Sequence, residues 1–213
     1  MTGGQVVVFG AGGHAKVVVD CLRDEGKYAV SALADADPAK AGRSIHGCVV
    51  VDEQQGMATA RAQAGAIVAI GNNEARARIA QALLDAGVAL VSAVHRSAVI
   101  ATTARIGRGT VVMPGAVINA DTAVGDNVIV NTRASIDHDC VIGNGVHVAP
   151  GSTICGGVQV GDRVLLGAGC VVLPGISIGD GARIAAGAIV TSDVPAHETY
   201  AGNPARKLER RNE

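Results

Sequence analysis

The sequence predicts a two-part chain, with an α/β domain over residues 1–93 and a parallel β-helix over 94–195, followed by a tail at 196–213. From residue 94 to 195 the chain divides into 17 blocks of six without an insertion, and each block begins with Val, Ile or Leu. Before the repeat, apolar runs of strand length alternate with amphipathic runs of helix length. Aromatic residues make up only 1% of the 213 residues. The core must therefore be filled by aliphatic side chains, which suits a narrow prism.

The N-terminal part is expected to form a parallel sheet covered by helices on both faces. Its apolar runs, its amphipathic runs and the Asp-Pro pair at 37–38 place the elements in order. They predict strands at 5–9, up to about 35, 48–51, 66–70 and 89–92, and helices at 16–25, 53–63 and 74–86.

A Gly-rich turn follows the first predicted strand and reads Gly10-x-Gly12-x-x-Ala15, with Asp35 twenty residues beyond Ala15. This spacing meets the dinucleotide-binding fingerprint, in which backbone N–H groups at a helix N-terminus approach a phosphate. A domain of 93 residues has room for one nucleotide-binding half and not for two, so NAD is disfavoured. The diphosphate end of a nucleotide sugar fits the size, and a tight turn without a ligand is the alternative.

Each hexad of the second part is interpreted as a short strand plus a turn, and three hexads form one triangular coil of 18 residues. β-branched aliphatic residues suit both the strands and the narrow interior. A β-sandwich is excluded because its strands recur every 8–12 residues. Three inner edges are predicted, at Val94, Val112, Val130, Val148, Leu166 and Ile184; at Ile100, Ile118, Ile136, Ile154, Val172 and Val190; and at Ile106, Val124, Ile142, Val160 and Ile178.

The overall composition disfavours several classes of protein. A formal net charge of −1 and the lack of a long basic tract argue against nucleic-acid binding. The five cysteines are odd in number and lack metal-like spacing, so we interpret them as reduced thiols and expect no metal site. No 18-residue apolar span and no leader-type N-terminus are found, which predicts a cytoplasmic protein without membrane insertion.

Three motifs together resemble one family: GAGGHAK at 10–16, IGNN at 70–73, and INADTAVGDNVIVNTRASIDHDCVIGNGVHVAPGSTICGGVQVG at 118–161. The chain is similar to the sialic acid O-acetyltransferase family, which includes the bacterial UDP-4-amino-sugar N-acetyltransferases. The resemblance implies a left-handed β-helix and a homotrimer. It also implies acetyl-CoA as co-substrate between neighbouring prisms, no metal, and a nucleotide-linked amino sugar in the N-terminal domain.

The resemblance also implies roles for particular residues. His138 would be the catalytic base, and Asp139 the acidic residue beside it. Acetyl-CoA would be contacted by His147 at the acetyl group, by the amide of Gly156 at the thioester oxygen, and by the backbone at Ala168 and Ala186. The nucleotide sugar would be contacted by Gly13, His14, Ala15, Asp35, Ala36 and Gly71. Because the family usually carries a second Asp where this chain has Ala36, both UDP and GDP sugars, such as GDP-perosamine, stay open.

The chemistry expected from these residues is direct attack of an amine on the thioester. A histidine suits the role of base because its pKa lies near the working pH. The acceptor would be a 4-amino-4,6-dideoxy sugar. Acetylation of a sugar hydroxyl, a β-helix carbonic anhydrase with zinc, and an inactive scaffold trimer are the alternatives.

For individual residues, a surface role for His138, a structural role for His147 and a helix-capping role for His14 also stay open. Arg206 and Lys207 would either meet CoA phosphates or form a solvated charged end.

Overall fold

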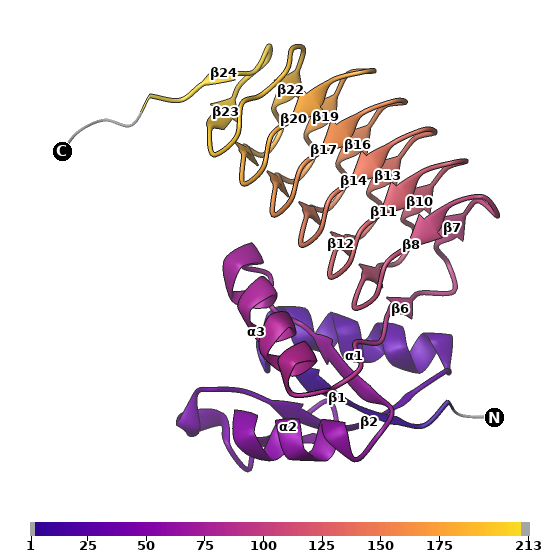
Figure 1. Cartoon of the computed structure of the whole chain (residues 1–213), viewed down its shortest axis with the longest axis vertical. Helices are drawn as coiled ribbons and strands as arrows, with labels where there is room; N and C mark the ends of the chain where they lie inside the picture. The colour runs from indigo at the N-terminus through magenta and orange to yellow at the C-terminus, as the bar shows by residue number, and fades with distance from the viewer. Residues whose placement is uncertain (1–2, 210–213) are drawn as a thin grey trace.

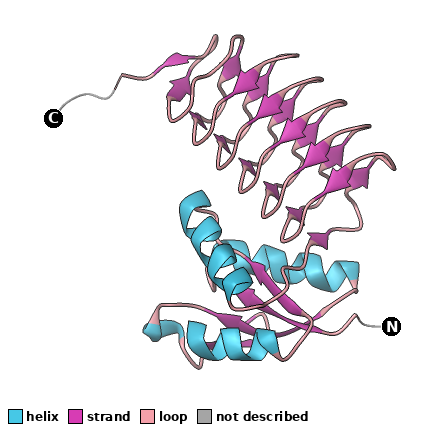
Figure 2. Cartoon of the chain, viewed as in Figure 1, coloured by secondary structure: helices cyan, strands magenta, loops and turns pink. Residues whose placement is uncertain are grey.

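The computed structural model describes residues 3–209 and shows the two predicted parts. Figure 1 shows the N-terminal α/β domain in indigo and purple at one end of a rod of stacked coils that runs to the C-terminus. Figure 2 shows helices only in the first part, and short strands repeated along three sides of the second. This arrangement confirms the fold class predicted from the period-six pattern. Within residues 3–209, no helix is long and apolar enough to cross a membrane.

The N-terminal domain is a five-stranded sheet in the order β3-β4-β2-β1-β5. All strand pairs are parallel except β3 with β4, an antiparallel addition that the sequence did not predict. The strands are β1 (Gln5–Phe9), β2 (Ala29–Ala34), β3 (Ser44–Ile45), β4 (Cys48–Val51) and β5 (Gly65–Val68); the helices are α1 (Gly13–Glu25), α2 (Glu53–Arg61) and α3 (Asn73–Asp85), with a 3-10 turn η1 (Pro38–Lys40).

Alternate side chains of the interior strand β1 point to opposite faces of the sheet, and each face has its own helices. Val6 and Val8 pack in one cluster with α1, whereas Val7 and Phe9 pack in another with α2 and α3. Helix α1 begins three residues earlier than predicted, because Gly12 caps it in an extended conformation directly after the strand. The strand expected at 89–92 is reduced to one bridge, between Leu90 and Ala66.

The rod consists of short strands in three sheets, joined by tight turns, and its strand pairs are parallel except the last, between Thr199–Ala201 and Arg206–Lys207. The three predicted inner edges are confirmed, since partners 18 residues apart pair in register throughout. One sheet holds β6 (Ala93–Val94), β9 (Val111–Val112), β12 (Ile129–Val130), β15 (His147–Val148), β18 (Leu165–Leu166), β21 (Arg183–Ile184), β23 (Thr199–Ala201) and β24 (Arg206–Lys207). The second holds β7 (Val99–Ile100), β10 (Val117–Ile118), β13 (Ser135–Ile136), β16 (Thr153–Ile154), β19 (Val171–Val172) and β22 (Ile189–Val190). The third holds β8 (Arg105–Ile106), β11 (Ala123–Val124), β14 (Val141–Ile142), β17 (Gln159–Val160) and β20 (Ser177–Ile178).

A buried arginine, Arg76 of α3, joins the two parts and is only 1% exposed. Its guanidinium donates to the carbonyls of Asn127 (3.0 Å), Gly145 (2.6 Å) and Val146 (3.3 Å) in the rod. On the domain side it donates to the carbonyls of Ile70 (3.1 Å) and Gly71 (3.3 Å) and to Oδ1 of Asn73 (2.8 Å). All three nitrogens of the guanidinium therefore donate hydrogen bonds, and together these bonds link the backbone of the domain to that of the rod.

Candidate functional site

His138 lies on an exposed turn of the rod, between β13 and β14, and its side chain is 61% exposed. The next residue, Asp139, has a left-handed backbone (φ 58°), which turns its carboxylate back toward the ring. His138 Nδ1 lies 2.8 Å from Oδ2 of Asp139. The turn itself is fixed by Asp137, whose Oδ1 accepts from the backbone N–H of His138 (2.9 Å) and from Asn119 (2.8 Å).

The contact with Asp139 decides where the imidazole carries its proton. An ionised carboxylate can only accept, so Nδ1 is the donor and Nε2 keeps its lone pair. The hydrogen bond to Asp139 raises the pKa of His138, and the negative charge of Asp137 adds to it. The exposed ring therefore has Nε2 as the nitrogen able to accept a proton, as a general base requires.

Gly156 lies one coil further along the rod, directly against the His138 ring. A Cβ at Gly156 would lie 2.6 Å from Cε1 and 2.7 Å from Nε2 of His138, distances that real Cβ contacts do not reach. Only glycine therefore lets the backbone pass this close to the reactive nitrogen. The N–H of Gly157 donates to the carbonyl of His138 (2.9 Å) and ties the two turns together.

A cavity of about 410 Å³ opens at the carboxyl ends of the sheet strands, and we call it the sheet-edge cavity. Five of the six residues predicted to hold the nucleotide sugar line it: Gly13, His14, Asp35, Ala36 and Gly71. The side chain of the sixth, Ala15, is buried in the α1 core. The lining also includes Gly10, Ala11, Gly12, Ala34, Lys40, Glu53, Ala69, Ile70, Arg78 and Ile79. The predicted binding turn is thus part of a real concavity.

Asp35 fixes the Gly-rich turn as well as lining the cavity. Its carboxylate accepts from the N–H groups of Ala11 (2.7 Å) and Asp37 (3.0 Å) and from Lys40 Nζ (2.9 Å). Burial alone would raise the pKa of Asp35, but these hydrogen bonds outweigh it and hold the pKa below its usual value. Asp35 is therefore ionised at neutral pH and already serves as an acceptor within its own chain.

Two half-buried histidines meet where the sheet-edge cavity approaches the rod. The ring centroids of His14 and His147 are 6.5 Å apart. Burial lowers the pKa of both to about 4; for His14 the charges of His147 and Arg76 lower it further, and for His147 that of Arg76. Asn131 Nδ2 lies 3.0 Å from Nε2 of His147, which therefore accepts. Helix α1 has no side-chain cap, so the capping role considered for His14 is wrong.

The structure thus separates the predicted residues into two groups. His138, Asp139 and Gly156 form one, and His14, Gly71 and His147 form the other, on the side of the rod that faces the N-terminal domain. Ala168 and Ala186 lie one above the other in turns at another corner, where the Gly187 N–H donates to the Ala168 carbonyl (2.8 Å). The contacts of these two residues with acetyl-CoA stay predictions.

Comparison with known families agrees with this architecture. Residues 5–83 match the PglD N-terminal domain, and residues 121–156 and 157–192 each match the six-repeat bacterial transferase hexapeptide family. A perosamine N-acetyltransferase from Caulobacter crescentus, solved with CoA and GDP-perosamine, is 40% identical over 96% of this chain and 97% of its own, with a TM-score of 0.91. The chain belongs to the nucleotide-amino-sugar acetyltransferase family.

Two other structures support the same membership. The acetyltransferase domain of PglB from Neisseria gonorrhoeae, solved with acetyl coenzyme A, is 35% identical over 96% of this chain and 98% of its own (TM-score 0.89). WeeI from Acinetobacter baumannii is 28% identical over 95% and 99% (TM-score 0.86). A comparison with curated proteins gives no match. The predicted family and enzyme class, an acyltransferase, are confirmed.

Some residues of the site were not identified from the sequence. Lys40, Glu53 and Arg78 line the sheet-edge cavity, and Arg76 donates to the carbonyl of Gly71, which also lines it. In the sequence each is one charged residue in a turn or an amphipathic helix, a pattern typical of a solvated surface. Within residues 3–209, no group of three His, Cys, Asp or Glu side chains is placed to hold a metal ion. The carbonic anhydrase alternative therefore gains no support from the described chain.

Proposed function

We propose that this enzyme transfers the acetyl group of acetyl-CoA to the amine of a nucleotide-linked 4-amino-4,6-dideoxy sugar, with His138 as general base. The observation that carries the proposal is the exposed His138–Asp139 pair, in which Nδ1 faces the carboxylate and Nε2 lies against the backbone of Gly156. The sheet-edge cavity at the N-terminus of α1 supplies a second site, of the kind that binds phosphate groups.

In the proposed reaction the amine nitrogen attacks the thioester carbonyl carbon, and Nε2 of His138 takes the proton that the nitrogen loses. Asp139 holds the ring in the correct tautomer and stabilises the imidazolium that forms. The backbone N–H of Gly156 would donate to the oxyanion of the tetrahedral intermediate, an interaction worth about 3–4 kcal/mol in other enzymes. Collapse of the intermediate breaks the carbon–sulfur bond, and the His138 imidazolium gives its proton to the departing sulfur, so that CoA leaves as the thiol and the base is regenerated. No covalent acyl-enzyme forms, so the transfer is direct.

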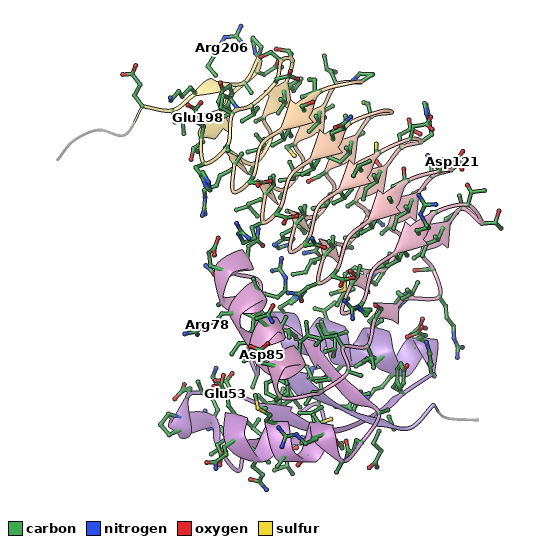
Figure 3. All side chains as sticks on the ribbon, viewed as in Figure 1. Glu53, Arg78, Asp85, Asp121, Glu198 and Arg206 are labelled. Carbon is green, nitrogen blue, oxygen red and sulfur yellow. The ribbon has the colours of Figure 1, made fainter. Side chains whose placement is uncertain are left out.

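The proposal requires more than one copy of the chain. Asp121 lies one coil from Asp139 at the same corner, since Asp139 N–H donates to the neighbouring Ala120 carbonyl (3.0 Å). Figure 3 shows this corner on the opposite side of the molecule from Arg78 and Glu53. A sugar nucleotide in the sheet-edge cavity would not reach His138 of its own chain. Docking of a second copy completes the site, and the family resemblance favours a homotrimer.

The experiment is a panel of UDP- and GDP-linked 4-amino sugars incubated with acetyl-CoA, in which release of free thiol is followed. Sialic acid in the same panel tests the alternative of a hydroxyl acceptor. His138→Asn should lower kcat by about 10²–10⁴-fold and leave the KM for acetyl-CoA nearly unchanged.

His46→Asn is the matched control for this variant. His46 also pairs with an aspartate (Nδ1 to Asp20 Oδ1, 3.2 Å), but it lies in the turn between β3 and β4, away from both groups of site residues. Near-normal turnover by the His138 variant would exclude its role as the base. The cytoplasmic location stays a prediction, consistent with acetyl-CoA as donor.

A further inference from the structure

The sheet-edge cavity crosses the ends of four neighbouring strands, β4, β2, β1 and β5, in that order. Along it the lining changes from Glu53 after β4, to Asp35 and Ala36 after β2, to the Gly-rich turn after β1, and to Gly71 after β5. Each end of the cavity therefore offers a different chemistry. Figure 3 shows Glu53 from α2 and Arg78 from α3 on the same side of the domain.

The Gly-rich turn is the place for the diphosphate. A Cβ added at Gly12 or Gly13 would meet no atom within 4 Å, so the backbone of both residues is open to a ligand. The first turn of α1 contains no acidic residue, and its unpaired N–H groups favour an anion. A diphosphate bound here has the β5 end of the cavity on one side and the β2 and β4 ends on the other.

The direction of the nucleotide follows from the position of the rod. His147 of the rod lies beside His14 at the β5 end, so the sugar that is to be acetylated belongs at that end. The nucleoside then extends over Asp35 and Ala36 toward Glu53. Two strand spacings, about 10 Å, separate β1 from β4. This span is comparable with the reach of a nucleoside from its 5′ oxygen to the edge of its base.

Glu53 is the acceptor that the base would meet. It is half-buried at the first turn of α2, and within residues 3–209 its side chain makes no hydrogen bond or ion pair, whereas Asp35 is already occupied by three donors. An ionised carboxylate offers two acceptor oxygens side by side. Guanine presents two adjacent donors, N1–H and the 2-amino group. Uracil presents one N–H between two carbonyl oxygens, which a carboxylate repels.

We propose that Glu53 selects guanine as the base of the nucleotide sugar, by accepting from N1–H and from the 2-amino group. The proposal rests on the function proposed above, and it assigns the substrate to the GDP-linked class. A site built to pair with specific donors rejects an analogue that lacks them, because the bound analogue shields the acceptor from water and leaves it unpaired.

Calorimetric titration of the whole protein with GDP, IDP and UDP tests the proposal. IDP keeps N1–H and lacks only the 2-amino group. GDP should bind about 10-fold or more tightly than IDP, and UDP should bind more weakly still. Glu53→Gln should reduce the GDP-to-IDP ratio to nearly 1 and leave acetyl-CoA binding unchanged.

Glu74→Gln is the matched control, because Glu74 also lies in the first turn of a helix but is 76% exposed and lies outside the cavity. It should keep the GDP-to-IDP ratio of the parent protein. Two results would overturn the assignment of guanine and leave the proposed function standing. One is UDP binding as tight as GDP binding, and the other is an unchanged GDP-to-IDP ratio in a Glu53 variant that melts like the parent protein. If none of the three nucleotides binds, the proposed function fails with it.

Discussion

Gly156→Ala tests whether the close approach of two turns sets the position of the catalytic ring. The added Cβ would lie 2.6 Å from the His138 ring, whereas ordinary contact begins at 3.4 Å, so the ring must retreat by about 0.8 Å. Alanine already occupies the same third position of its hexad at Ala168 and Ala186, and Gly156 has no positive φ, so the backbone tolerates the change. A misplacement of about 1 Å can cost roughly 10²-fold in rate. We therefore expect kcat to fall between about 10- and 100-fold.

Steady-state release of CoA thiol measures the loss of rate, and thermal unfolding measures the effect on the fold. The melting temperature should stay nearly constant, because the exposed His138 ring can swing outward. In a His138→Ala background the same change should cost little further activity, since no ring remains to be displaced. Equal losses from Gly156→Ala in both backgrounds, or an unchanged kcat in the parent, would refute the steric reasoning.

Two further predictions concern Arg76 and Asp139. Arg76→Met should lower the free energy of unfolding by about 3–5 kcal/mol, because several buried carbonyls lose their donor. The control, Arg61→Met, loses one bond to the Ala86 carbonyl (2.9 Å) and should cost about 1 kcal/mol or less. Urea unfolding measures both, and equal losses would contradict this prediction. Asp139→Asn should move the acidic limb of the kcat/KM profile to lower pH, because the pKa of His138 is raised chiefly by Asp139. Because the pKa of His138 is raised in the folded state, its protonation stabilises the fold fully below pH 6.5, and this stabilisation is lost as pH rises through the raised value. Asp139→Asn should therefore lack this stabilisation at low pH. An acidic limb that stays in place would exclude Asp139 as the cause.

The period of six made the rod predictable down to its three inner edges, because the spacing of Val, Ile and Leu determines which residues stack in a β-helix. The N-terminal domain was less fully predictable. Residues 89–92 have strand-like composition, but only Leu90 bridges to Ala66 before the chain turns into the first coil. Tertiary packing against the rod overrode the local preference there.

Site residues that belong to a sequence motif were predicted, whereas those placed by packing between distant segments were missed. His138 and Asp139 are adjacent in sequence, so their pairing followed from the motif. Arg76 was missed because its rod acceptors are 51 to 70 residues away and are backbone carbonyls, which no sequence pattern records. The reason for glycine at position 156 was also hidden, since it depends on a ring one coil away.

The environments of three histidines assign their roles more sharply than the motifs do. A base must be neutral at working pH yet basic enough to take the proton of an ammonium as it forms. Burial lowers the pKa of His14 and His147 to about 4, which keeps them neutral but makes them poor proton acceptors. His138 alone among the three has a raised pKa, and its side chain is exposed. His14 and His147 are therefore suited to hydrogen-bond a bound sugar without charge, which supports the proposal that His138 removes the proton.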